Sequence, residues 1–211
     1  MESPICPRPE PGLTLIETLG WDGAGFPRLD RHLARLARSA ALLGWTCDPD
    51  AARLALQSAA PDPPARMRLT LDATGQITVT ASALPAALPL WKIGLAPQRL
   101  TASDPWLRLK SSHRLAYDAA RAALPAGLDE VILLNERDEV CDGSITTIFF
   151  DAGQGLCTPP QSCGLLPGVL REELLQTGQA REAVLMVQDL SSVKLWVGNS
   201  LRGLSAAKWL G

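Results

Sequence analysis

One lysine in the sequence lies where a nucleophile can be made. Lys110 follows the mostly apolar run WLRL at 106–109 and comes just before a predicted helix. A lysine at an apolar edge can lose its proton by desolvation, and the neutral amine can then form a Schiff base with a carbonyl compound. Because most lysines are solvated, Lys110 taken alone is a candidate for this chemistry and nothing more.

A helix start in the second half of the chain has the composition of an anion site. The segment 164–171 reads GLLPGVLR, with a proline at the first turn of an expected helix. The free backbone N–H groups at such an N-terminus, those near Val169 and Leu170, would point towards a bound anion. Many helices begin with proline and glycine for geometric reasons, so in isolation an ordinary helix start explains the segment better.

The segment GNSLRG at 198–203 has a similar character. Two glycines bracket small polar residues and an arginine directly after a predicted strand. A nest of backbone N–H groups, together with the side chains of Asn199 and Ser200, can hold a phosphate or a carboxylate. Arg202 is a candidate for binding a substrate. An ordinary turn is again the better explanation when the segment is taken alone.

The composition excludes several classes of protein. Of the 211 residues 46% are hydrophobic, and the formal net charge is −2. The chain can therefore bury a large core, and it has no basic surplus for nucleic acid or an anionic membrane. No apolar run is long enough to span a bilayer. Residues 1–11 lack the basic and apolar regions of a signal peptide, so we expect a cytoplasmic protein.

The histidines, cysteines and clustered acidic residues of this sequence do not predict a metal site or an acid–base pair. There are two histidines, and the five cysteines are scattered without a CxxC pair: Cys6, Cys47, Cys141, Cys157 and Cys163. No metal site is predicted, and the thiols are expected to be reduced and structural. The acidic residues between 129 and 139 surround a predicted turn, and we interpret them as a solvated charge cluster.

The periodicity of the first half predicts two helices and a hairpin. A helix is expected over 29–44, with Asp30 as its N-cap and Gly44 at its end, and a second helix over 50–59. Two strands, joined by the tight turn 72–75, are expected over 67–71 and 76–83.

The second half begins after an Ala/Pro-rich stretch, residues 84–90, which is the expected linker. Strands and helices both follow: strands over 92–96, 130–134, 145–150, 183–187 and 194–197, and helices over 111–124 and 167–177. Strands in both halves with an antiparallel hairpin favour an α+β fold. We predict a small N-terminal α/β domain, residues 1–88, and a larger β-rich C-terminal domain, residues 89–211.

Taken in order, these segments resemble the class IV aminotransferases, the pyridoxal 5'-phosphate (PLP) enzymes of fold type IV. Residues 15–19 resemble the family's early strand, and 32–36 its H-x-x-R-L helix. Residues 109–112 are similar to the Schiff-base lysine segment. The stretch 129–149 resembles the block that contains E-G-S-x-x-N, and 164–171 resembles G-x-L-P-G-x-x-R. The shared order and approximate spacing carry the resemblance over nearly the whole chain.

The resemblance implies a fold like that of D-amino acid aminotransferase and a role for each residue. Lys110 would form the Schiff base with PLP and move protons. Asp142 would face the pyridine nitrogen and keep it protonated, so that the ring can accept electrons from a Cα carbanion. The phosphate would be bound by groups from three segments: Arg35, the N–H groups of Val169 and Leu170, Asn199 and Ser200.

The sequence departs from the family's pattern in four places. Asp142 stands where glutamate is usual, and Thr147 where asparagine is common. The turn at 72–75 is tight where many relatives have a longer loop with an arginine that helps to recognise the substrate. The N-terminus is short, where relatives have a further strand with an aromatic residue near the cofactor. Cofactor binding is expected to survive these changes better than the substrate assignment does.

The leading reaction is that of aminodeoxychorismate lyase, which converts 4-amino-4-deoxychorismate to 4-aminobenzoate and pyruvate in folate synthesis. The GNSLRG ending resembles that of short bacterial members placed with the lyases. The alternatives are transamination of a branched-chain or D-amino acid, and a family member that binds PLP without turnover or retains only the scaffold. The expected partner is a small-molecule amine, with neither nucleic acid nor membrane, and the expected assembly is a homodimer.

Overall fold

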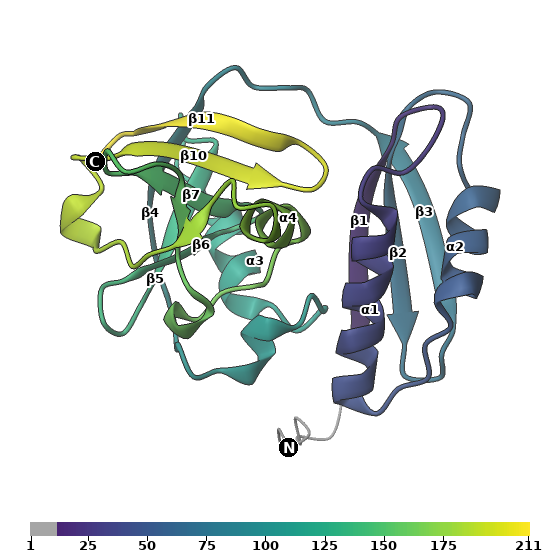
Figure 1. The fold of residues 1–211 in the computed structure, drawn as a ribbon. Coiled ribbons are helices and arrows are strands. Elements are labelled where there is room, and N and C mark those ends of the chain that lie inside the picture. The colour runs from purple at the N-terminus through teal and green to yellow at the C-terminus, as the bar shows by residue number, and fades with distance from the viewer. Residues whose placement is uncertain (1–11) are drawn as a thin grey trace. The chain divides into compact units, whose positions relative to one another are not determined.

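The computed structural model describes residues 12–211, so the predictions on the N-terminal residues and on Cys6 lie outside the described part of the chain. The chain divides into two compact units (Figure 1). Unit 1 contains the residues up to Ala86 together with Leu109–His113, and unit 2 contains Ala87–Arg108 and Arg114–Gly211. The predicted boundary after residue 88 did not anticipate that the residues around Lys110 cluster with the N-terminal unit.

Unit 1 is a three-stranded antiparallel sheet with two helices. The strands β1 (Thr14–Trp21), β2 (Ala65–Asp72) and β3 (Ile77–Ala83) stand in the order β1-β2-β3. The helices α1 (Leu29–Leu43) and α2 (Pro49–Ser58) pack against the sheet through one hydrophobic cluster. Every second residue of β2 is buried, as expected of a strand that presents one face to a core.

The turns of unit 1 follow the sequence closely, with one exception. Gly44 ends α1 in the left-handed region at φ 70°, as predicted. The hairpin turn is confirmed: the Asp72 side chain accepts hydrogen bonds from the N–H groups of Thr74 and Gln76 at 2.9 and 3.0 Å. The predicted cap Asp30 is wrong, because the N-cap is Arg28, whose side chain makes no capping bond, and Asp30 lies in the first turn of the helix.

Unit 2 is built on an eight-stranded mixed sheet with the order β6-β5-β4-β11-β10-β7-β8-β9. The two contacts β5-β4 and β4-β11 are parallel, and so is β8-β9, whereas the other neighbours are antiparallel. The strands are β4 (Trp91–Leu100), β5 (Glu130–Asn135), β6 (Val140–Gly143), β7 (Thr147–Asp151), β8 (Cys157–Thr158), β9 (Arg181–Glu182), β10 (Lys194–Asn199) and β11 (Gly203–Trp209).

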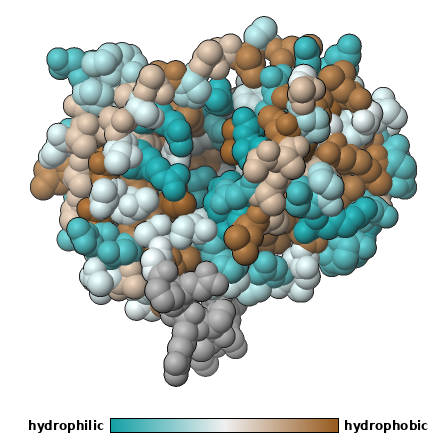
Figure 2. Space-filling model, turned by 180° about the vertical axis from the view of Figure 1, so that it is seen from behind, coloured by the Kyte–Doolittle hydropathy of each residue, from teal (hydrophilic) through white to brown (hydrophobic). Residues whose placement is uncertain are grey.

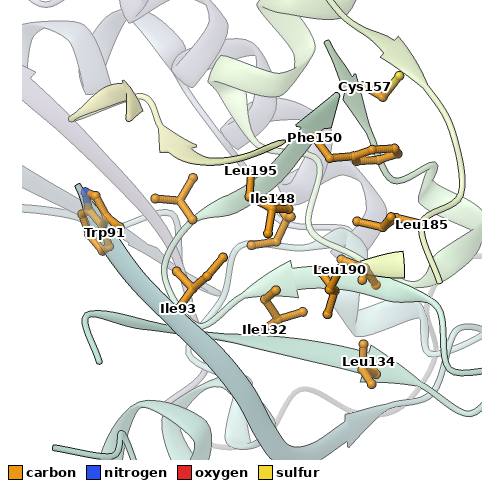
Figure 3. Close-up of a cluster of buried hydrophobic side chains, with 12 residues drawn as sticks. Trp91, Ile93, Ile132, Leu134, Ile148, Phe150, Cys157, Leu185, Leu190 and Leu195 are labelled. Carbon is orange, nitrogen blue, oxygen red and sulfur yellow. The ribbon is translucent and has the colours of Figure 1, made fainter. Parts of the chain in front are cut away.

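Strand β5 is buried on both faces because a separate cluster covers each of them. Ile132 and Leu134 point into the cluster drawn in Figure 3, which also contains Trp91 and Phe150. The alternate residues Val131 and Leu133 join a second cluster that includes residues of α3 (Leu115–Ala122). All six residues of β5 are therefore buried, which explains its nearly continuous apolar sequence.

The sequence misplaced several elements of unit 2. No strand covers 183–187; instead β9 ends at Glu182 and a short 3₁₀ helix occupies Val187–Asp189. The expected helix 111–124 is shorter, because Ser111 bridges β1 and α3 begins only at Leu115. Strand β11, which pairs with β10 and β4, was not predicted. The remaining helices are α4 (Val169–Gln176) and two further 3₁₀ turns, Pro105–Arg108 and Gln161–Cys163.

On the face drawn in Figure 2, hydrophobic side chains occur in small groups among hydrophilic ones, which is usual for a protein surface. Among the described residues, no helix combines the length and the hydropathy needed to cross a bilayer.

Candidate functional site

Unit 1 contains a buried charged group formed by β1 and α1. The Glu17 carboxylate accepts hydrogen bonds from Arg35 Nε at 2.8 Å and from Arg35 Nη2 at 2.6 Å. His32 Nδ1 lies 2.6 Å from Glu17 Oε2. His32 and Arg35 are three residues apart, so they share one face of α1, which is turned towards the strand. All three side chains are buried.

The pairing decides which members of this group are charged. Burial by itself raises the pKa of Glu17, but the charge and the hydrogen bonds of Arg35, helped by His32, lower that pKa to about 2. Burial lowers the pKa of His32, and the bond to Glu17 opposes this effect. Glu17 and Arg35 thus form an ion pair beside a largely neutral histidine at pH 7, and the bidentate contact fixes the plane of the guanidinium.

Lys110 belongs to this same unit. Its backbone carbonyl accepts a hydrogen bond from the Ile16 N–H at 2.8 Å, and Ser112 N–H donates to the Thr14 carbonyl at 2.8 Å. The segment 109–113 therefore pairs with β1 along the edge of the small sheet. The Lys110 side chain is half-buried, and its charge contributes to lowering the pKa of His32. The structure thus places Lys110 close enough to the Arg35 group for its charge to act on His32.

In unit 2 the predicted residue Asp142 lies on β6 and is buried. Its Oδ2 accepts a hydrogen bond from the Leu166 N–H at 3.3 Å and a long one from the Tyr117 hydroxyl at 3.5 Å. Its Oδ1 accepts one from the Gly143 N–H at 3.2 Å. All three bonds are longer than charge-assisted hydrogen bonds, which usually measure about 2.7–2.9 Å.

The weak bonds leave the burial of Asp142 largely uncompensated. Burial raises the pKa of Asp142 to about 8, and the negative charge of Glu130 adds to the effect, whereas the N–H groups of Leu166 and Gly143 oppose it. A buried carboxyl in this state would be stabilised in its charged form by a cation or a strong hydrogen-bond donor. Asp142 is therefore a buried carboxyl with long hydrogen bonds, and the positive charge of Arg171 offsets its burial only in part.

The N-terminus of α4 lies next to the strand that follows Asp142. The N-cap, Gly168, has an extended backbone, and no side chain caps the helix. A Cβ on Gly168 would come within 2.9 Å of Thr147 Oγ1, so the close approach requires glycine. Val169 and Leu170, the first two helical residues, are both buried. The helix dipole and these uncapped N–H groups favour an anion at this end.

The turn between β10 and β11 is packed against the same region. A Cβ on Gly198 would lie 2.8 Å from Leu170 Cδ2, and Asn199 Nδ2 donates to the Ile145 carbonyl at 3.2 Å. Asn199 Oδ1 accepts from the N–H groups of Leu201 and Arg202 at 3.1 and 3.0 Å. The Asn199 side chain thus holds the turn together, a role that the sequence had not indicated.

Ser200 and Arg202 occupy the tip of this turn, where both are half-buried. The guanidinium carbon of Arg202 lies 5.2 Å from the centre of the Trp91 ring. This distance is typical of a cation–π contact, which would hold the guanidinium in a defined place. Unit 2 therefore brings Asp142, the start of α4 and the β10–β11 turn into one region.

Two acidic residues of these regions were missed by sequence reasoning. Glu17 lies in the early strand 15–19, and the sequence had predicted no role for its side chain. Glu130 was assigned to a solvated cluster, and this is wrong: its side chain is fully buried and accepts hydrogen bonds from Ser144, Ile145 and Thr146. The charge count near the turn suggested solvation, and only the apolar run that follows Glu130 could have indicated that the strand is buried.

The remaining candidate chemistry gives no second site. Among the described residues, no group of histidine, cysteine and acidic side chains could hold a metal ion. Of the cysteines in this part of the chain, Cys141 and Cys163 are buried and reduced. Burial raises the pKa of Cys163 to about 12, and it also raises that of Cys141. Such thiols are unreactive and act as packing residues.

The family model described as Amino-transferase class IV matches residues 14–209. The chain belongs to this family. Class IV aminotransferases use PLP, and this chain is a PLP-dependent enzyme of the family. The crystal structure of a provisionally named amino-acid aminotransferase from Mesorhizobium loti is 46% identical, with a TM-score of 0.89, over 94% of this chain and all of the other. The predicted family, α+β fold and cofactor are thus confirmed.

Two further proteins extend the comparison. A provisionally named aminodeoxychorismate lyase from Schizosaccharomyces pombe is 29% identical over 181 residues, which are 80% of this chain and 75% of that protein. A hypothetical aminotransferase from Mycobacterium tuberculosis, solved in a PLP-bound form, is 22% identical with a TM-score of 0.79. The match covers 94% of this chain and 81% of that one, and at this identity it supports the fold.

The residues of unit 2 are chemically suited to PLP. A phosphate monoester needs N–H donors, and the uncapped start of α4 offers those of Val169 and Leu170 beside a glycine that admits close approach. A protonated pyridine nitrogen needs a carboxylate, and Asp142 is a buried carboxyl that lacks a cationic partner among its hydrogen bonds. The class IV cofactor therefore fits the donor and acceptor types that the fold presents here.

The state of Asp142 predicts how the cofactor-free protein responds to pH. A carboxyl whose pKa is raised to about 8 on folding binds its proton more tightly in the native state, so its contribution to stability is lost as pH rises towards 8. We expect Asp142→Asn to become more stable than the parent by about 2 kcal/mol on going from pH 6 to pH 8.

Urea unfolding of both proteins at a series of pH values measures this difference. The difference between the two free energies of unfolding does not contain the contribution of His32, which is the same in both proteins. The lowered pKa of His32 would otherwise make stability fall as the pH drops below 6.5. Parallel pH profiles of the two proteins would show that Asp142 is charged throughout, and the electrostatic description of this site would then be wrong.

Proposed function

We propose that this class IV enzyme removes the Cα proton of an amino-acid-like amine and that its reaction is that of aminodeoxychorismate lyase. The observation that carries the first part is the pairing, within unit 2, of a buried carboxyl without a cationic partner and an uncapped helix N-terminus. PLP, when bound, supplies an electron sink for the charge that is left on Cα. The residues of the chain have the tasks of binding, orientation and proton transfer.

Each task is assigned to a residue that the resemblance implies. Lys110 Nζ would hold the cofactor covalently and, when free, would take the proton from Cα of the substrate. The Asp142 carboxylate would accept a hydrogen bond from the protonated ring nitrogen and so preserve that proton. One cationic group and several neutral groups would donate hydrogen bonds to the phosphate: Arg35, the N–H groups of Val169 and Leu170, Asn199 and Ser200.

Substrate recognition is assigned to Arg202. Its guanidinium rests on the Trp91 ring, and a planar guanidinium held in this way can bind a carboxylate through two parallel hydrogen bonds. 4-Amino-4-deoxychorismate carries two carboxylates, so a positioned arginine suits it. In the lyase reaction the Cα proton is removed, the C–O bond to the enolpyruvyl group breaks, and that group is protonated to pyruvate while the ring becomes aromatic.

Transamination of an amino acid is the second candidate. It is favoured by the similarity to the Mesorhizobium loti protein at 46% identity over the whole of that chain, whereas the lyase is supported by the more distant Schizosaccharomyces pombe relative at 29%. The two reactions share the removal of the Cα proton and differ in where a proton is returned.

Two parallel assays decide between these reactions. Purified enzyme with 4-amino-4-deoxychorismate should release 4-aminobenzoate and pyruvate in equal amounts. The same preparation should be incubated with a panel of branched-chain and D-amino acids together with 2-oxo acids. Amine transfer between members of the panel, without pyruvate release from the first substrate, would replace the lyase by the transaminase. Absence of both reactions in a PLP-loaded protein would leave a binding protein without turnover.

Lys110→Ala should abolish covalent attachment of the cofactor and nearly all activity. In the parent protein, borohydride reduction should place one pyridoxyl label on the peptide that contains Lys110, as read by mass spectrometry. Lys92→Ala, which replaces an exposed lysine on β4, serves as the matched control and should keep the label and the activity. Turnover of Lys110→Ala at the parent rate would refute the assignment.

Arg35→Lys should weaken the preference of the protein for PLP over pyridoxal, which lacks the phosphate. We expect a loss of about 1.5–3 kcal/mol in this preference, the range for hydrogen bonds to charged groups. The ratio of the two dissociation constants is insensitive to general damage in unit 1, because a disturbed Glu17 would weaken the binding of PLP and of pyridoxal alike. An unchanged preference would mean that Arg35 serves only the ion pair with Glu17.

Asp142→Asn removes the charge beside the proposed ring nitrogen at nearly constant shape. It should slow removal of the Cα proton by at least about tenfold, which corresponds to about 1.4 kcal/mol of barrier. Attachment of the cofactor to Lys110 should persist. The measurement is the rate of α-deuterium exchange in substrate, and Asp142→Glu should keep or raise the parent rate. A parent-like rate in Asp142→Asn would assign Asp142 to structure alone.

We also propose that the enzyme is a homodimer, since class IV aminotransferases are typically dimeric. Light scattering coupled to size-exclusion chromatography, at the concentrations used for the assays, measures the mass directly. A mass close to the 22.5 kDa of one chain in active enzyme would contradict the proposal.

A further inference from the structure

Glu130, the first residue of β5, lies beneath the turn that follows Asp142. Its side chain is fully buried. Its Oε1 accepts hydrogen bonds from the Ser144 N–H at 2.9 Å and from the Ser144 hydroxyl. Its Oε2 accepts from the Ile145 N–H at 3.1 Å and from the Thr146 hydroxyl at 2.9 Å. One carboxylate therefore receives hydrogen bonds from three consecutive residues of the turn.

Gly143 shows how closely this turn is drawn onto the carboxylate. Its N–H donates to the Thr146 carbonyl at 2.7 Å and closes the turn. A Cβ on Gly143 would lie 2.6 Å from Thr146 Oγ1 and 3.0 Å from Glu130 Cδ. No side chain fits between the turn and the acid. The backbone that leaves Asp142 is thus held by packing as well as by hydrogen bonds.

The turn is linked to Asp142, to the start of α4 and to Asn199, three of the places in unit 2 that we assign to the cofactor. Asp142 precedes it by two residues, and Thr147, which touches Gly168 at the start of α4, follows it directly. The Ile145 carbonyl accepts the hydrogen bond from Asn199 Nδ2 at 3.2 Å. A displacement of the turn would therefore change both the contact that we assign to Asp142 with the ring and the contacts that we assign to Asn199 and the start of α4 with the phosphate.

The charge of Glu130 is well compensated, in contrast to that of Asp142. Four donors of the turn and the Val131 N–H at 2.9 Å point at its two oxygens, and Arg121 Nη1 lies 4.0 Å from Oε1. These hydrogen bonds tie the Glu130 carboxylate to the backbone and side chains of one turn. A glutamine at position 130 would place an NH2 group opposite some of these N–H and O–H groups, and two donors cannot form a hydrogen bond with each other.

We propose that Glu130 is a positioning residue for PLP: by fixing the turn 144–146 it orients both the Asp142 carboxyl and Asn199 towards the cofactor. The proposal rests on the proposed function, because it requires Asp142 and Asn199 to contact PLP. It assigns to Glu130 no contact with the cofactor or the substrate. Its effect is on the geometry of groups that do make such contacts, and hence on cofactor affinity and spectrum.

The primary test is Glu130→Gln. In the cofactor-free protein, amide hydrogen exchange of Ser144 and Ile145 should become faster than in the parent, because one of the two oxygens that accept their bonds is lost. The dissociation constant for PLP should rise at least about tenfold, and the absorption maximum of the bound cofactor should shift. Glu136→Gln, the same change at an exposed residue just beyond the other end of β5, should leave all three quantities at the parent values.

A second comparison separates positioning from general loss of stability. Leu134→Ala creates a cavity in the same strand but on the side of the cluster shown in Figure 3, and the variants are compared in urea concentrations that give equal unfolded fractions. The rise in the PLP dissociation constant should then remain in Glu130→Gln and be absent from Leu134→Ala. If Glu130→Gln does not fold, Thr146→Val removes one of the bonds to Glu130 and should raise the dissociation constant in the same direction by a few-fold.

Two results would overturn the proposal. One is parent-like PLP affinity and spectrum in Glu130→Gln, or in Thr146→Val where only that variant folds. The other is an equal loss of affinity in Leu134→Ala at matched unfolded fraction. Failure of the proposed function is recognised separately, because the parent protein would then show no borohydride label on Lys110, whereas a labelled parent with an indifferent Glu130→Gln rejects the positioning role alone.

Discussion

A carboxylate that is removed from water must be given a cation or several N–H and O–H donors, and the two units satisfy this constraint differently. In unit 1 the charge of Glu17 is balanced by the Arg35 guanidinium. In unit 2 the charge of Glu130 is balanced mainly by the donors of one turn. Both solutions fix the local backbone, because the donors must all point at one small group. Asp142 is the exception, since its three hydrogen bonds are long and its pKa is raised to about 8.

The exception is informative because it lies beside a second group whose hydrogen bonding is incomplete. The helix α4 begins without a side-chain cap, and an uncapped N-terminus leaves N–H groups that a ligand can satisfy. A single ligand with a phosphate at one end and a protonated nitrogen at the other would answer both needs. Binding of such a ligand would also stabilise the folded chain.

The sequence was sufficient for the fold class, the family and most elements of unit 1, because these follow from strong local signals. The alternation along β2 and the turn residues Asp72 and Gly44 each specify their own structure. It was less reliable for β9 and β11, since β9 pairs with β8 and β11 pairs with β4, and both of these partners are distant in the chain. Strand β11 contains only half-exposed and exposed residues, so its sequence lacks the alternation of apolar and polar residues that predicts a strand.

The site shows the same division between local and distant information. The motif order named Lys110, Asp142 and the start of α4 as candidates, but it could not show what balances each charge. Glu17 precedes Arg35 by eighteen residues and Glu130 precedes Ser144 by fourteen, so neither pair has a spacing that a helix or a strand would signal. Glu130 in particular sits among other acids in the sequence and owes its burial to the two clusters that cover β5.

Asp142 in place of the family's usual glutamate acquires a physical meaning in this setting. A shorter side chain keeps the carboxyl close to its own backbone, where the Gly143 N–H reaches it at 3.2 Å, and it limits how far the charge extends from β6. The position of that charge then depends directly on the backbone of β6 and of the turn after it, because a side chain with fewer rotatable bonds cannot adjust to a displaced backbone. A glutamate could compensate for such a displacement through its extra methylene group. The firm anchoring of the turn by Glu130 and the short acid at Asp142 are therefore two parts of one arrangement, in which precision comes from the backbone and not from the side chain.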